Sequence, residues 1–187
     1  LGLLFFIKSK ELDQKFFNLF LKSMNEHGNH IYNNLENLQS NNSNHYIGNL
    51  FGLFFIALIF SLFHESKKWL SFAQKELEKE IYDQTFEDGW GFESSVPYHK
   101  LITEMFLYCY ILGKNLEAPF SKSFEQRLFL MLKNLFIIAK PNNMIPQIGD
   151  NDSSKIFSFM PEASSLDLKE ISILINKTNI NINNTKQ

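Results

Sequence analysis

Two stretches of the chain, residues 45–63 and 98–112, are apolar on nearly every face at helical periodicity. A helix without a polar face has to be covered by other elements on all sides. Residues 64–84 and 123–140 instead carry a single apolar stripe, which in the first of them is Trp69, Leu70, Ala73, Leu77 and Ile81. The order buried, exposed, buried, exposed predicts inner helices ringed by outer ones. No run alternates with a two-residue period, so the predicted fold class is all-α.

Shorter patterns flank this repeat. Helices are predicted over residues 8–26, 30–38 and 166–175, with Gly28 interrupting the first pair. Gly113 is the predicted stop of the second inner helix. Ser123 and Gln126 have the spacing of a capping box for the helix that follows. Residues 141–154 form a predicted loop, and the Asn-rich end of the chain is expected to fray.

Helix order predicts where the functional residues meet. Consecutive helices joined by short connections run antiparallel, so the inner helices should run parallel and begin at one end. Asn44-His45 opens the first inner helix and Tyr98-His99 opens the second. The long polar connections 39–44, 84–97 and 141–165 are predicted at this same end, and such connections often bind ligands. Helix N-termini carry partial positive charge, which predicts a mouth that favours an anionic ligand.

Composition excludes several classes of function. A net charge of −2 offers no field for nucleic acid and no polybasic membrane anchor. The apolar run 50–63 is about 14 residues long, shorter than the roughly 20 that a membrane span needs. Residues 1–7 lack the basic region and cleavage site of a signal peptide. The sequence predicts no cofactor. It predicts no metal site either, because Asp150 and Asp152 lack the remaining ligand spacing of a calcium-binding loop. Cys109 lies in an apolar run and is expected to be a buried, unreactive thiol.

The loop 88–99 concentrates the residues that could carry chemistry. Tyr98 beside an imidazole at a helix start is suited to proton transfer, although a tyrosine that only packs at a helix start is the more common case. Asn44 and His45 could donate hydrogen bonds to a carboxylate, or serve as a helix cap and a core histidine. Asp88 and Glu93 could be a glycosidase pair, although turn or capping roles are more common. Trp90 could stack on a sugar ring or close the edge of the core.

These motifs together resemble a known family. Asn44-His45 before an apolar helix, then Trp69-Leu70, Glu80-x-x-x-Gln84, Asp88-Gly89, Glu93-Ser94 and Tyr98-His99, look like the helical domain of heparinase II/III-type and alginate lyase-type polysaccharide lyases. The segment Pro146-x-Ile148-Gly149-Asp150-x-Asp152 is similar to a later loop of the same proteins. The resemblance covers roughly residues 35–159.

The resemblance implies an incomplete (α/α) toroid. Residues 1–165 would be the later part of this toroid. Residues 166–187 would be a weak helix and a frayed Asn-rich end before a missing C-terminal β-sandwich domain. Lyases of this kind are often periplasmic or secreted, which is the compartment that the resemblance favours.

The family's chemistry is β-elimination at a uronic acid of an acidic polysaccharide. By the resemblance, Asn44 and His45 neutralise the substrate carboxylate, and Tyr98 acts as base or acid. His99 would support Tyr98 or pack beneath it. These expectations extend to further substrate-binding positions, namely His99, Glu93, Trp90, Gln147 and Asp150. A further His or Tyr of the family comes from its β-sandwich domain, so this chain alone is expected to be inactive or very weak.

Two alternatives stay open. An isoprenoid-cyclase-like helical barrel would explain Gln84, Asp88-Gly89 and Trp90, but its Gln/Trp repeats should recur and no second copy is visible. A non-catalytic carbohydrate-binding or scaffold relative with the same toroid would keep the helices and lack turnover.

Overall fold

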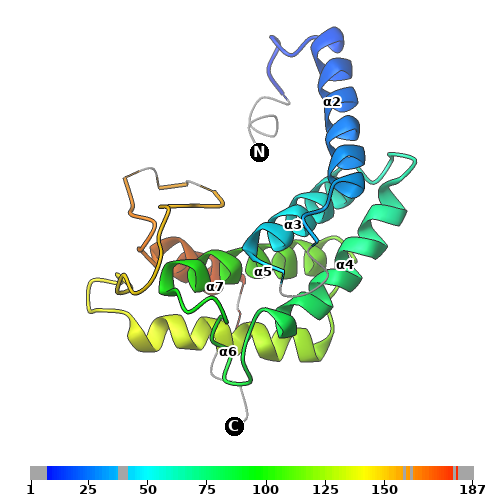
Figure 1. Ribbon diagram of the computed structural model, residues 1–187. Helices are drawn as coiled ribbons and strands as arrows, with labels where there is room; N and C mark the ends of the chain where they lie inside the picture. The colour runs from blue at the N-terminus through cyan, green and yellow to red at the C-terminus, as the bar shows by residue number, and fades with distance from the viewer. Residues whose placement is uncertain (1–7, 38–41, 158, 161, 179, 181–187) are drawn as a thin grey trace.

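The computed structural model describes residues 8–37, 42–157, 159–160, 162–178 and 180. Its helices are α2 (Gln14–Asn33), α3 (Asn44–Ile59), α4 (Ser66–Asp83), α5 (Val96–Asn115), α6 (Lys122–Ile138) and α7 (Lys169–Thr178) (Figure 1). Extended pairing among the described residues is confined to two isolated bridges, Thr85 with Gly91 and Met144 with Asp167. The predicted all-α class is confirmed. Residues 39–41 of the predicted loop 39–44, residue 38 of the predicted helix 30–38, and most of the predicted frayed end lie outside the described residues.

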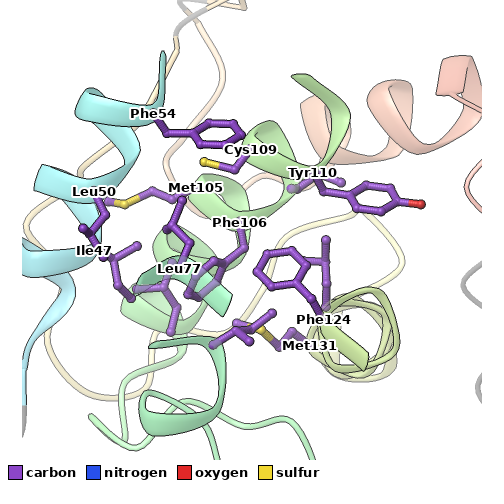
Figure 2. Close-up of a cluster of buried hydrophobic side chains, with 14 of the residues drawn as sticks. Ile47, Leu50, Phe54, Leu77, Met105, Phe106, Cys109, Tyr110, Phe124 and Met131 are labelled. Atoms are coloured by element: carbon purple, nitrogen blue, oxygen red, sulfur yellow. The ribbon is translucent and has the colours of Figure 1, made fainter. Parts of the chain in front are cut away.

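The core lies where α3, α4, α5 and α6 meet. Every residue of α5 from Leu101 to Tyr110 is buried, whereas α4 and α6 bury one face each. Figure 2 shows side chains of all four helices meeting in this core, from Leu50 on α3 to Leu77, Phe106 and Phe124 on the others. The predicted sequence of inner and outer helices is therefore confirmed. The expectation that residues 45–63 form a helix covered on all sides was wrong, because α3 ends at Ile59, buries one face only, and leaves Leu62 beyond its end 99% exposed. Among the described residues, no helix is both long and apolar enough to cross a bilayer.

Helix α2 corrects the prediction that Gly28 interrupts a helix. The helix runs unbroken from Gln14 to Asn33, and Asp13 caps it by accepting a hydrogen bond from the backbone of Phe16 at 2.6 Å. Gly28 is buried, and a Cβ at this position would lie 2.5 Å from Cζ3 of the buried Trp69 indole. This glycine therefore serves close packing between helices. The first half of α2 extends away from the other helices (Figure 1), leaving Phe16 and Leu19 exposed.

Two other predicted boundaries were wrong. Helix α5 continues through Gly113 to Asn115, because Gly113 is a close-packing position where a Cβ would clash with the carbonyl oxygen of Ala118. Helix α6 is capped by Ser121, whose hydroxyl accepts a hydrogen bond from the backbone of Phe124 at 3.1 Å. Ser123 lies inside the helix, so the capping-box spacing was coincidental. Both errors concern local signals that packing or a neighbouring serine overrode.

An ion pair lies within the nearly apolar α5. The Nζ of Lys100 is 2.5 Å from Oε1 of Glu104, with the two side chains 4% and 7% exposed. Burial raises the pKa of the Glu104 carboxyl, and the Lys100 ammonium opposes that rise. Removing either partner alone would leave an uncompensated buried charge, which is strongly destabilising. The inner helix is therefore tied to one specific packing.

The contact between Gly28 and Trp69 leads to a test with two helical glycines. Gly28→Ala should lower the free energy of unfolding by about 1–3 kcal/mol, because the added methyl overlaps a buried ring. Gly48→Ala in α3 should raise it by about 0.5–1 kcal/mol, because its Cβ would lie 4.0 Å from the nearest atom, Cε of Met105, and alanine favours the helix. Urea unfolding followed by circular dichroism measures both. Equal effects from the two variants would contradict this account.

Candidate functional site

Helix α3 begins against the loop that precedes α5. The carboxylate of Glu93 accepts a hydrogen bond from the backbone N–H of Asn44 at 2.9 Å. It also accepts from Nδ2 of the Asn44 side chain, at 3.4 Å to Oε1 and 3.1 Å to Oε2. Because Ser95 caps α5 two residues after Glu93, these contacts bring the starts of the two inner helices together. The predicted convergence of Asn44 with the loop 84–95 is confirmed.

The loop 139–168 joins the same end of the molecule. The backbone N–H of Val96 donates to the carbonyl of Ile148 at 2.9 Å, and the Ser95 hydroxyl donates to the carbonyl of Asp150 at 2.6 Å. Gly149 makes this approach possible. It has a positive φ of 79°, and a Cβ there would lie 2.8 Å from the Ser94 carbonyl oxygen. The loops therefore meet as predicted, and we call the region around Asn44, Glu93, Tyr98 and Asp150 the mouth.

Tyr98 lies in the first turn of α5 and is half-buried. Desolvation raises the pKa of its phenol, and the carboxylates of Asp152, Asp150 and Glu93 raise it further. A phenol with a raised pKa is fully protonated near neutral pH. Tyr98 in this environment could donate a proton, and it would act as a base only beside a cation that offsets these charges.

His45 is exposed, with 64% of its side chain accessible. Its Nδ1 lies 3.3 Å from Oε2 of Glu36. His45 also acts on Asp152: the Ser154 hydroxyl is the main cause that lowers the pKa of the Asp152 carboxyl, and the nearby imidazole contributes to the same shift. His45 therefore lies on the side of the mouth where the loop 139–168 passes.

His99 is buried, and both of its ring nitrogens have backbone partners. Nδ1 accepts from the N–H of Gly91 at 3.1 Å, so Nε2 carries the proton and donates to the carbonyl of Met131 at 3.2 Å. Burial is the main cause that lowers the pKa of the imidazole to about 4. His99 thus joins the loop 84–95 to α6 as a neutral side chain. Of the two predicted roles, packing fits this position, since the side chain is 2% exposed and its ring lies against that of Trp90.

Outer helix α6 anchors the loop 84–95, which the sequence did not reveal. Arg127, the single arginine of the chain, donates to the carbonyl of Phe86, and Asn134 donates to the carbonyl of Asp88 at 2.9 Å. Gly89, with φ 86°, lies against α6, where a Cβ would approach Leu130 Cβ to 2.8 Å. The polar residues at 127 and 134 lie two turns apart on one face of an amphipathic helix, which was the available signal.

The other predicted substrate-binding residues lie on the two loops that meet at the mouth. Trp90 is half-buried, with its ring centroid 4.7 Å from that of His99, and borders an apolar pocket of about 330 Å³. The pocket is also lined by Phe86, Ile138, Pro146 and Ile148. Gln147 is exposed and accepts from Nδ2 of Asn151 at 3.3 Å. Asp150 is exposed, and its carboxylate acts on Tyr98.

The electrostatic expectation for the mouth needs correction. A positive helix terminus was predicted to favour an anion, but the carboxylate of Glu93 already occupies the N-terminus of α3. Asp150 and Asp152 add negative charge beside Tyr98. Within the part of the chain that the structure describes, no three His, Cys, Asp or Glu side chains gather as metal ligands. An anion here would have to be recognised by directed hydrogen bonds.

The fold defines the class: these helices superpose on part of the helical toroid of heparinase III. Residues 2–165 match the model of the heparinase II/III N-terminus, and the chain belongs to that family. The predicted resemblance is confirmed at this level. Residues 166–187 lie beyond the match.

Known relatives agree with this assignment. The chain is 33% identical over 99 residues to a heparin-sulfate lyase of Pedobacter heparinus, covering 52% of this chain and 15% of that protein. It superposes on the crystal structure of heparinase III with a TM-score of 0.68 at 21% identity, covering 80% of this chain and 22% of the other. It superposes on the crystal structure of heparan sulfate lyase HepC of Pedobacter heparinus with a TM-score of 0.67 at 22% identity, covering 97% of this chain and 28% of the other. The chain thus spans less than a third of the length of each of these relatives.

The buried His99 predicts a pH dependence of stability. The folded pKa of about 4 lies below the ordinary value of 6.5, so the unfolded chain binds the proton first as pH falls. His99 should therefore have no effect on the pH dependence above pH 6.5, and stability should fall from there to about pH 4 by up to about 1.4 kcal/mol per unit. Urea unfolding at several pH values measures the slope. His99→Gln should flatten it, and an unchanged slope in the variant would refute the assignment.

The acidic surroundings of Tyr98 predict a second titration. Asp150→Asn and Asp152→Asn should each lower the pKa of Tyr98, because each removes a negative charge that disfavours the phenolate. Nuclear magnetic resonance of the ¹³C-labelled Tyr98 ring across alkaline pH measures the shift. Glu87→Gln, on the exposed part of the loop 84–95, is the control and should leave the titration in place. A Tyr98 pKa indifferent to both aspartates would contradict the geometry.

Proposed function

We propose that the protein carrying this chain cleaves a uronate-containing acidic polysaccharide by β-elimination. The observation that supports this most is the gathering of Asn44, Glu93 and Tyr98 at one mouth in a chain of the heparinase II/III N-terminal family. The relative from Pedobacter heparinus is a heparin-sulfate lyase, which favours a glycosaminoglycan of that type as the substrate.

The first step in this proposal is recognition of the uronate carboxylate. Asn44 and His45 donate hydrogen bonds to it, which lowers the cost of building negative charge as the C5 proton leaves. The acidic character of the mouth gives no general attraction for a polyanion. Binding therefore rests on these directed donors, and only a carboxylate placed between them is stabilised.

The second step is proton transfer. A base removes the C5 proton, its electron pair forms the C4–C5 double bond, and the C4–O bond breaks. Tyr98, held protonated by its surroundings, donates the proton that the leaving oxygen needs. Following the family, we propose that a His or Tyr of a β-sandwich domain completes the site, so that this chain alone would bind its substrate and turn it over weakly or not at all.

The remaining predicted residues take supporting parts in the proposal. Trp90 offers a ring face to a sugar at the edge of the mouth, and Gln147 and Asp150 offer hydrogen-bond partners from the loop 139–168. His99 acts from beneath, since its bond to Gly91 fixes the backbone next to Trp90.

The lyase proposal is tested by its product. The protein carrying this chain, given heparan sulfate or another uronate polymer, should release unsaturated uronate that absorbs in the ultraviolet. Tyr98→Phe should reduce the rate by about 10²-fold or more, because general acid–base catalysis typically contributes 10²–10⁴-fold. Circular dichroism should show an unchanged fold.

Tyr32→Phe is the matched control, because Tyr32 packs against Phe72 and lies outside the mouth. It should retain full activity. Full activity in Tyr98→Phe would refute the role of Tyr98. Binding of uronate oligosaccharides without any product would instead support a carbohydrate-binding relative with the same toroid.

A further inference from the structure

The carboxylate of Glu93 contacts Asn44 through two different groups. It accepts the backbone N–H at 2.9 Å, and the side-chain Nδ2 lies 3.1 Å from Oε2 and 3.4 Å from Oε1. Asn44 is the first residue of α3, so its backbone N–H has no partner inside the helix. One acidic side chain thus satisfies an open helix end and holds the side chain of the same residue.

This arrangement fixes which end of the Asn44 amide faces Glu93. An ionised carboxylate only accepts hydrogen bonds, so it attracts the amide nitrogen and repels Oδ1. The two carboxylate oxygens lie close together, so a single N–H can be shared between them. The second N–H of Nδ2 points in another direction, about 120° away in the amide plane, and is available to another acceptor.

We propose that Glu93 is a positioning residue that holds the Asn44 amide with its second N–H ready for a substrate carboxylate. The inference rests on the proposed function and assigns Glu93 a role other than the direct contact with substrate expected from the sequence. Its consequence is preorganisation: Asn44 neither rotates nor flips when the uronate arrives, so the donor needs no reorganisation.

The charge of Glu93 makes this inference testable, because the two possible roles of Glu93 predict opposite changes in uronate affinity when the charge is removed. A carboxylate near a bound carboxylate repels it, so a Glu93 that was merely a neighbour would weaken uronate binding. Glu93→Gln would then tighten binding. A positioning Glu93 predicts the reverse, because a glutamine amide can place its own donor against Nδ2 and let the Asn44 amide turn. We expect Glu93→Gln to weaken binding about tenfold or more, as for loss of a hydrogen bond to a charged group.

Binding is measured by calorimetry with a glucuronate-containing tetrasaccharide. Glu87→Gln is the matched control, since it removes an equal charge from the exposed part of the same loop, and it should bind as the unsubstituted chain does. In Asn44→Ala, the further change Glu93→Gln should have no additional weakening effect, because Glu93 acts through Asn44. Additive losses, or tighter binding in Glu93→Gln, would overturn the proposal.

A second measurement needs no substrate. With ¹⁵N-labelled asparagine, the two side-chain protons of Asn44 should be widely separated in chemical shift, with one of them slow to exchange. Glu93→Gln should bring them together, and thermal unfolding should show that the variant is folded. Unchanged Asn44 amide signals would overturn the positioning role. If these signals change and the folded chain binds no uronate, the positioning geometry stands and the proposed function fails.

Discussion

The burial of α5 is the constraint on which the remaining structure depends. A helix whose residues from Leu101 to Tyr110 are all enclosed cannot lie at the edge of a bundle, so α3 and α6 have to pack against it. The ion pair of Lys100 and Glu104 adds a second condition, because loss of either partner would leave an uncompensated charge in the buried helix. Once α3 and α5 are inner helices joined through an outer one, their first residues lie at the same end, and Asn44 meets the loop before α5.

Much of this arrangement could be predicted from periodicity, since burial patterns report on whole faces of helices. The all-α class, the inner and outer layers and the meeting of Asn44 with the loop 84–95 followed from that signal. Single-residue signals were weaker. A glycine within a helical pattern usually indicates that the helix ends, yet Gly28 and Gly113 each lie where another segment comes too close for a Cβ. Only the tertiary packing distinguishes these two uses of glycine.

The candidate site was predicted less completely, for a physical reason. Sequence spacing identified Asn44, His45 and Tyr98 as neighbours but not the partners of their polar groups. The carboxylate of Glu93 contacts the start of α3, and the aspartates of the loop 139–168 act on Tyr98. These contacts depend on how three loops fold over one another. Because of them the mouth is acidic rather than positive as expected, and an anion would have to be recognised there by oriented hydrogen-bond donors. The hydrogen bonds that Arg127 and Asn134 donate to the loop 84–95 likewise come from a helix, α6, that is remote from the loop in sequence.

The anchoring of the loop 84–95 has a consequence for how such a protein can diversify. Three of its hydrogen bonds to Arg127, Asn134 and His99 are made by main-chain atoms of the loop, namely the carbonyls of residues 86 and 88 and the amide of residue 91. Main-chain atoms are the same whatever side chain a residue bears. The exposed side chains of Phe86 and Glu87 can therefore be exchanged while the backbone keeps its course. The side chains of Asp88 and Trp90 are more constrained, because Asp88 accepts a hydrogen bond from the backbone of Trp90 and the Trp90 ring packs against His99.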